Sequence, residues 1–342
     1  MRVCTALLLF FSLILSACAI PQTEPEGRIF RHGESGDLKP WSDTTFDAVG
    51  DKFTFAVFSD LTGGERDGVF EVAIEQINLL RPEFIINVGD LIEGDEERAE
   101  VDRQWDSFDD RARRARAPVF YAGGNHDLLG PVLQQAWRQR YGSTYYHFVY
   151  RDVLFLVLDT EDHSAERLEE IARLRWAAID VASTQGWDAF AETEYARLPE
   201  NVAGNISGEQ SDYMLKAIAD NPDVRWTFLF MHKAPWKRPD MATFAAIEEA
   251  LAERPYTVFH GHEHVYEYEL RNGRDYLQLA TTGGVQFPER GRSADQLVLV
   301  TVDDEGVDIA NLLMAGILDK TGRVPLGGDG ICFELALCGA SQ

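Results

Sequence analysis

The sequence feature that most restricts the fold is a set of apolar segments that each end in acidic, amide or imidazole residues. The segments and the polar residues after them are 53–58 with Asp60, 84–88 with Asp90, 118–121 with Asn125, His126 and Asp127, 225–231 with His232, and 256–259 with His260, His262 and His264. Their apolar patterns predict buried β-strands, and apolar spacing over 69–80 predicts a helix between the first two. Strand–helix–strand order with polar strand ends is typical of α/β folds, whose ligand sites lie at the carboxyl edge of a sheet.

Further elements are predicted around this set. Residues 96–116 are highly charged and predict a surface helix, while 145–158 predict a hairpin. Residues 162–200 are polar and rich in Ala, Glu and Arg, which predicts either an inserted helical cap or a purely structural excursion. Ser207 begins a sequence that resembles a capping box, with Gln210 three residues later.

The patterns predict one compact domain and flanking segments rather than two domains. The expected divisions are a signal peptide at 1–17, a tether at 18–48, the domain at 49–315 with a helical insertion at about 162–205, and a C-terminal extension at 316–342.

Carboxylates, an amide oxygen and imidazoles from five loops are the ligand types that a pair of divalent metal ions requires. A bridging carboxylate can hold two ions about 3.5–4 Å apart, and such pairs activate water and hold the oxygens of a displacement at phosphorus. Imidazole ligands suit Zn, Fe or Mn. Gly261 allows a tight turn between His260 and the alternate histidines His262 and His264, so that these two can reach different ions.

The order of these motifs resembles that of the calcineurin-like metallophosphoesterases. The residues that carry the resemblance are Asp60-Leu61-Thr62, Gly89-Asp90, Gly124-Asn125-His126-Asp127, His232 and Gly261-His262-Glu263-His264. Gly-Asn-His-Asp together with a downstream Gly-His-x-His is a specific combination. The resemblance implies an α/β fold of four layers, a four-layer α-β-β-α sandwich in which two mixed sheets pack face to face with helices outside.

The resemblance also implies a role for each residue. Asp60 and His264 would bind a first metal ion, Asp90 would bridge two ions, and the ligands of the second ion would be Asn125, His232 and His262. His126 would face the leaving oxygen as a general acid or as a stabiliser of the transition state. Asp127 would orient His126 and keep it protonated. The two ions would be Mn, Fe or Zn.

One position departs from the family pattern, because Thr62 stands where the family usually has a histidine. A neutral hydroxyl is a poor substitute for imidazole on a transition metal. Glu93 and Glu65 are candidate replacements for that ligand, and if neither serves, the first site is expected to be weak or to hold a harder ion.

The N-terminus predicts export. Arg2 precedes an apolar run over 5–17, and Leu15-Ser16-Ala17-Cys18 resembles a bacterial lipobox. The expected location is therefore the periplasm, with the protein held as an outer-membrane lipoprotein by lipid on Cys18. Ordinary secretion after an Ala-x-Ala site is the alternative. In an oxidising compartment, a disulfide between Cys332 and Cys338 is favoured over two buried thiols.

Composition argues against a nucleic-acid partner. The chain has 57 Asp and Glu against 32 Lys and Arg, a formal net charge of −25, whereas nucleic-acid binding needs basic surfaces. An exported nuclease therefore fits poorly. The cations expected near a phosphate are Lys233, Lys237 or Arg238, and the 287–292 loop, with Phe287, Arg290 and Arg292, is a further guess from position alone.

Together these observations predict a metal-dependent phosphoesterase that hydrolyses a phosphate mono- or diester of a small compound. The resemblance implies attack by a metal-bound hydroxide. The alternative is a catalytically weak family member that serves as an anchored binding or scaffold lipoprotein, supported by Thr62 and the helical insertion. The sequence gives no substrate identity and no oligomeric state.

Overall fold

The computed structural model describes residues 30–34, 36–44 and 52–338. The expected signal peptide, Cys18 and much of the expected tether lie outside this part of the chain. Two mixed sheets form the centre of the described structure. The seven-stranded sheet has the order β1 (Phe30–His32), β5 (Tyr146–Tyr150), β6 (Val153–Val157), β7 (Trp226–Phe230), β8 (Tyr256–His260), β10 (Arg274–Gln278) and β9 (Glu267–Arg271). The five-stranded sheet has the order β12 (Gly306–Leu313), β11 (Gln296–Asp303), β2 (Phe53–Phe58), β3 (Phe84–Asn87) and β4 (Val119–Phe120).

The two sheets pack face to face through aromatic side chains. Phe55 of β2 stacks on Phe84 of β3 with ring centroids 5.2 Å apart, and it meets Phe228 of β7 edge-on at 5.0 Å. Successive side chains of a strand point to opposite faces of its sheet, and these rings lie on the inner faces, in one cluster between the two sheets. Burying such rings supplies much of the free energy that stabilises the fold, at roughly 25 cal/mol per Å² of apolar surface removed from water.

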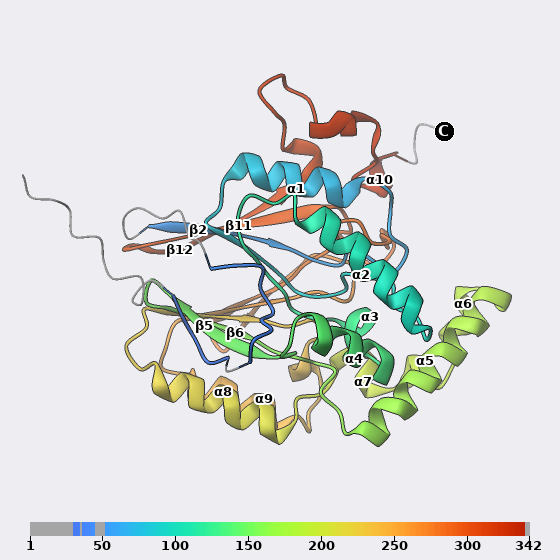
Figure 1. Ribbon diagram of the computed structural model, residues 1–342, viewed down its shortest axis with the longest axis horizontal. Coiled ribbons are helices and arrows are strands. Elements are labelled where there is room, and N and C mark those ends of the chain that lie inside the picture. Colours follow the sequence, from blue (N-terminus) through green and yellow to red (C-terminus); the bar gives the residue numbers. More distant parts are fainter. Residues whose placement is uncertain (1–29, 35, 45–51, 339–342) are drawn as a thin grey trace, which may run out of the picture.

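Helices cover the outer face of each sheet (Figure 1), which confirms the predicted four-layer sandwich. The helices over the five-stranded sheet are α1 (Val69–Leu80), α2 (Arg98–Ala112) and α4 (Pro131–Arg140), and those over the seven-stranded sheet are α8 (Gly208–Asp220) and α9 (Ala242–Ala250). None of the helices in the described part of the chain combines the length and apolar character needed to cross a membrane.

The predicted insertion contains helices, as its composition indicated. They are α5 (Ala165–Gln185), α6 (Trp187–Phe190), η2 (Tyr195–Arg197) and α7 (Pro199–Ala203). The capping box expected at Ser207 is half formed. The Ser207 hydroxyl accepts a hydrogen bond from the Gln210 backbone N–H at 3.1 Å, but the Gln210 side chain bonds to the backbone of Asp159 instead of returning to the cap.

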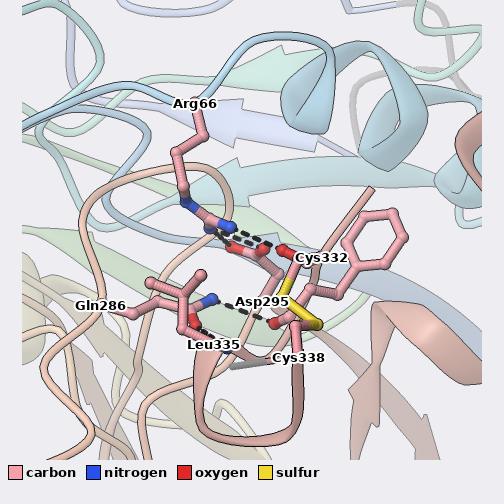
Figure 2. Close-up of a disulfide and its surroundings, with 7 residues drawn as sticks. Arg66, Gln286, Asp295, Cys332, Leu335 and Cys338 are labelled. Atoms are coloured by element: carbon pink, nitrogen blue, oxygen red, sulfur yellow. Dashed lines mark hydrogen bonds and ion pairs between the residues drawn. A yellow bond between two sulfur atoms is a disulfide. The ribbon is translucent and has the colours of Figure 1, made fainter. Parts of the chain in front are cut away.

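The C-terminal segment returns over α1 and contains η4 (Met314–Gly316), η5 (Pro325–Gly330) and α10 (Leu335–Cys338). Its end is closed by a disulfide between Cys332 and Cys338 (Figure 2), the pairing favoured from the sequence. Arg66 donates to the Cys332 carbonyl at 2.9 Å and pairs with the buried Asp295 at 2.5 Å. The segment is thereby attached to the loop between β2 and α1.

Candidate metal centre

The predicted ligands from both sheets meet at one place, because each follows the carboxyl end of a strand. Asp60 follows β2, Asp90 follows β3 and Asn125 begins α3 (Asn125–Leu128) just after β4. His232 comes two residues after β7, and the turn with His262 and His264 follows β8. The parallel pairings β2–β3–β4 and β7–β8 bring these ends to the same edges of their sheets.

Two groups of side chains in the described structure have the composition and spacing of metal sites, and Asp90 belongs to both. One group is Asp90, His232 and His262, and the other is Asp60, Asp90 and His264; within each group the ligand atoms lie within 4.8 Å of one another. His232 Nε2 lies 3.1 Å from Asp90 Oδ2, and His264 Nε2 lies 3.3 Å from Asp60 Oδ1. The shared position of Asp90 agrees with the bridging role that the family resemblance implied.

Backbone carbonyl groups orient two of the imidazoles. His232 Nδ1 lies 2.9 Å from the Val88 oxygen, and His264 Nδ1 lies 2.5 Å from the Val285 oxygen. A carbonyl can only accept, so each Nδ1 carries a proton, and Nε2 is the ring nitrogen that is left to bind a metal ion. This arrangement is typical of metal-binding histidines.

The backbone at the site is strained. Four residues have a positive φ between 43° and 78°, a region that residues other than glycine rarely adopt. They are Asp60, Asp90, His262 and His264. Such conformations cost about 1–3 kcal/mol each and persist where the surrounding structure enforces them. The strain therefore falls on four of the predicted ligands.

Two motif glycines are required by close packing. A Cβ atom at Gly124 would collide with Asp90 Oδ1, and one at Gly261 would collide with Asp60 Oδ2. The Gly261 turn also lets the His262 backbone N–H donate to Asp60 Oδ1 at 3.1 Å. The turn predicted at Gly261 is therefore packed closely against Asp60.

Asn125 is buried, and its Oδ1 has no hydrogen-bond partner among the described residues. An unpaired buried amide oxygen is costly, so such atoms in native structures usually meet a ligand, an ion or water. Together with the carboxylate and imidazole groups, this oxygen fits the ligand set of a divalent cation.

The charges at the site also favour a bound cation. Burial works against ionisation of Asp90, but the facing imidazoles of His232 and His126 bring its pKa well below the usual range. Burial likewise opposes a charged His232, yet contact with Asp90 raises the His232 pKa to about 9. Buried carboxylates here require positive charge beside them, and metal ions supply that charge.

The predicted partnership of His126 with Asp127 is not what the structure shows. Asp127 is fully buried, and its carboxylate accepts hydrogen bonds from the backbone N–H groups of Asp90, Leu91 and Gly124 at 2.8–2.9 Å. His126 Nδ1 instead lies 2.8 Å from the Glu93 carbonyl oxygen. Asp127 therefore holds the loop that carries Asp90, while a backbone carbonyl orients His126.

Neither candidate for the missing histidine lies in the two groups. The Glu93 carboxylate accepts from the backbone N–H groups of Gly63, Gly64 and Glu65, and the Glu65 side chain pairs with Arg111. Thr62 is buried and donates to the Asp90 carbonyl oxygen at 3.2 Å. The sequence could not show that the Glu93 side chain caps a turn.

The cations expected near a phosphate have other partners. Lys233 forms a buried ion pair with Glu161, at 2.6 Å and with both side chains at most 1% exposed. Lys237 donates to Gln278 at 3.4 Å, and Arg238 donates to the Gly204 carbonyl oxygen at 3.1 Å.

The 287–292 loop was predicted to lie near the site, and one of its residues contacts a predicted ligand. Phe287 packs on His264 with ring centroids 5.6 Å apart, and the Arg290 guanidinium lies over the Phe287 ring. This loop therefore borders the group that contains Asp60.

Comparison with known proteins agrees with this geometry. The sequence profile of the calcineurin-like phosphoesterase family matches residues 53–266, and the chain belongs to that family. No curated protein sequence matches the chain. Among solved structures, purple acid phosphatase PPD1 from yellow lupin seeds is similar over 83% of this chain and 53% of its own length, with 14% identity and a TM-score of 0.51.

Two more solved structures are similar to the chain at lower scores. GAP50, the anchor in the inner membrane complex of Plasmodium, matches over 80% of this chain and 87% of its own, with 12% identity and a TM-score of 0.49. The 5'-nucleotidase of Candida albicans matches over 80% and 54%, with 11% identity and a TM-score of 0.42. The chain thus spans about half the length of the lupin and Candida proteins.

Proposed function

We propose that the protein is a metal-dependent phosphoesterase that hydrolyses a phosphate ester of a small compound. The observation that carries this proposal is the shared position of Asp90 between two groups of potential ligands. Asn125, with its buried unpaired oxygen, stands at the start of α3 between Gly124 and His126, which both contact Asp90. A scaffold needs no such arrangement of buried charge, which destabilises a fold unless it is compensated.

In this proposal one set of residues binds metal ions and another residue, His126, transfers a proton. The residues proposed to hold two ions, of Mn, Fe or Zn, are Asp60, Asp90, Asn125, His232, His262 and His264. When bound, such ions lower the pKa of water and neutralise charge on phosphoryl oxygens.

His126 is placed to donate a proton to the leaving group. Its Nδ1 is engaged by the Glu93 carbonyl, so Nε2 is the free ring nitrogen, and it lies 4.0 Å from Asp90 Oδ2. The His126 side chain is 19% exposed, whereas that of Asp90 is 2% exposed. His126 therefore stands at the accessible side of the site, where Nε2 can pass a proton to a departing oxygen.

We also propose that the protein is exported and anchored by lipid on Cys18. The lipobox-like segment supports this location, and so does the Cys332–Cys338 disulfide, because disulfides persist in oxidising compartments. Palmitate labelling of the wild type, lost in Cys18→Ala, would test the anchor; labelling that survives the substitution would contradict it.

Activity is tested on the purified protein with an aryl phosphate monoester and a bis-aryl phosphate diester, with and without added Mn or Fe. We expect added metal to raise turnover, and both Asn125→Ala and His262→Ala to lower kcat/KM by about 100-fold or more, as removal of metal ligands does. His147→Gln is the matched control, since His147 lies on β5 and contacts Tyr213.

Metal content measured on the same samples separates the two functions considered. Bound metal with turnover supports the enzyme. No bound metal and no turnover would contradict it and support an anchored scaffold. Unchanged turnover in Asn125→Ala and His262→Ala would contradict the proposed site.

A further inference from the structure

Arg175 is a buried cation on α5 of the helical insertion. The residue is 3% exposed, and its Nη1 is buried with no hydrogen-bond partner among the residues that the structure describes. Its guanidinium carbon lies 4.7 Å from the centre of the Trp176 ring. A ring face stabilises a guanidinium but satisfies none of its five N–H donors in the plane of the group.

Helix α5 places Arg175 beside the loop that carries His126. Leu129, which follows α3, packs in one apolar cluster with Leu174, the residue before Arg175. At Gly130, an added Cβ atom would lie 3.5 Å from the Cβ of Ala172, one turn earlier on α5. Figure 1 shows α5 next to α4 and α7, and α5 contacts α4.

Electrostatic effects agree with this placement. Tyr195, which faces α5 in the same apolar cluster, is within range of both Arg175 and Asp90. The charges of Arg175 and of Asp90 therefore both reach Tyr195, which places Arg175 on the side of the insertion that faces the candidate metal centre.

The other cations at the base of the insertion differ from Arg175 in having carboxylate partners. Lys233 is paired with Glu161 at 2.6 Å, and Arg167 is paired with Glu200 at 2.9 Å. A buried charge without a partner destabilises the fold. Arg175 is therefore the cation best placed to receive an anionic ligand.

We propose that Arg175 binds the phosphoryl oxygens of the substrate and selects phosphate monoesters over diesters. This inference rests on the proposed function, because it places the phosphate at the metal centre. A guanidinium binds two oxygens of one phosphate in a paired contact. A monoester carries three terminal oxygens and nearly two negative charges, so two oxygens stay available to Arg175 when the third faces the metal ligands. A diester has two terminal oxygens and one charge.

The test uses Arg175→Met, which keeps an apolar stem of similar length, and Arg175→Lys, which keeps the charge. Arg173→Met is the control, since Arg173 is exposed on the same helix. The measurements are the Kd of inorganic phosphate for the metal-loaded full-length protein, by titration calorimetry, and kcat/KM for an aryl monoester and a bis-aryl diester. Metal content and urea unfolding are recorded for every variant.

In Arg175→Met we expect phosphate binding to weaken by roughly 30- to 100-fold, the loss typical of a buried charged contact. The monoester kcat/KM should fall at least as much, and the diester value by less than about fivefold. Arg175→Lys should weaken phosphate binding by about five- to tenfold, because an ammonium cannot make the paired contact. Arg173→Met should match the wild type.

The inference is overturned if either Arg175 variant, folded and metal-loaded, binds phosphate within twofold of the wild type, or if the wild type binds no phosphate. It is also overturned if monoester and diester activities fall equally. If Arg175→Met does not fold, Arg175→Lys decides. Phosphate binding that depends on Arg175 in a wild type without turnover would refute the proposed function and leave the anion site standing. If the wild type turns over substrate and substitution of Arg175 changes nothing, the anion site is refuted and the proposed function stands.

Discussion

Substitution of Asp127 by asparagine separates a structural role from a catalytic one. The Asp127 carboxylate accepts four backbone hydrogen bonds in a fully buried position. Oδ2 accepts from the N–H groups of Asp90 and Gly124, both at 2.8 Å, and Oδ1 accepts from those of Leu91 at 2.9 Å and Ile92 at 3.2 Å. Asparagine has a single acceptor oxygen, so it can serve only one of these pairs. Its NH2 group would face the two donors of the other pair.

The expected loss of stability follows from this geometry. Two buried backbone N–H groups lose their acceptor, and each unsatisfied group costs about 1–3 kcal/mol. We therefore expect Asp127→Asn to lower the free energy of unfolding by about 2–6 kcal/mol. Because one of the affected pairs includes the Asp90 N–H, the variant should also bind metal more weakly.

Urea unfolding in the presence of a chelator measures the stability without any contribution from metal. His126→Ala is the comparison, since His126 has one backbone contact through its ring and should unfold within about 1 kcal/mol of the wild type. The reasoning is refuted if Asp127→Asn is as stable as the wild type while its kcat falls as in His126→Ala. That result would restore the catalytic partnership predicted from the sequence.

Three further outcomes are expected. Gly261→Ala should abolish the group containing Asp60, because the new Cβ collides with that carboxylate; metal analysis should show about half the wild-type content, and full content would contradict the clash. Burial lowers the pKa of His147 to about 4, below its unfolded value of about 6.5, so the wild type should lose up to roughly 2 kcal/mol as pH falls from 6.5 to 4. Urea unfolding of His147→Gln at pH 6.5 and pH 4 should not show this loss. If the free energy of unfolding falls as much in His147→Gln as in the wild type, His147 is not its cause. Chelation should lower the melting temperature of the wild type by several degrees without unfolding it, since native-state ligands stabilise by mass action; an unchanged melting temperature would mean that no metal binds the native protein.

Much of the sandwich could be predicted from the sequence because its central strands are apolar on both faces or alternate strictly. The strand predicted at 53–58 and the helix predicted at 69–80 coincide with β2 and α1. β12 was missed because it lies at the edge of its sheet and is only partly buried, which leaves no clear apolar alternation. α4 was missed although Pro131 at its first turn is a typical helix start.

The ligand set could be predicted because motif residues that follow strands must meet at sheet edges. The partners of Asp127 and Glu93 could not, since both bind backbone N–H groups and no side-chain pattern records such contacts. The burial of Arg175 could not be predicted from the sequence either. Its helix is polar and rich in charge, so the sequence alone did not distinguish it from exposed arginines such as Arg173.

The candidate metal ligands are held in place by hydrogen bonds to the protein's own backbone. Val88 and Val285 carbonyls set two imidazoles, and Asp127 fixes the loop of Asp90. The core between the sheets involves none of these ligands. Small metal-dependent domains fold only with their ion because they lack such a core. The strained ligand positions follow strands of this core, so we expect the fold to hold their backbone and metal affinity to depend on it. Substitutions in the core that relax this strain should therefore weaken metal binding before they unfold the protein.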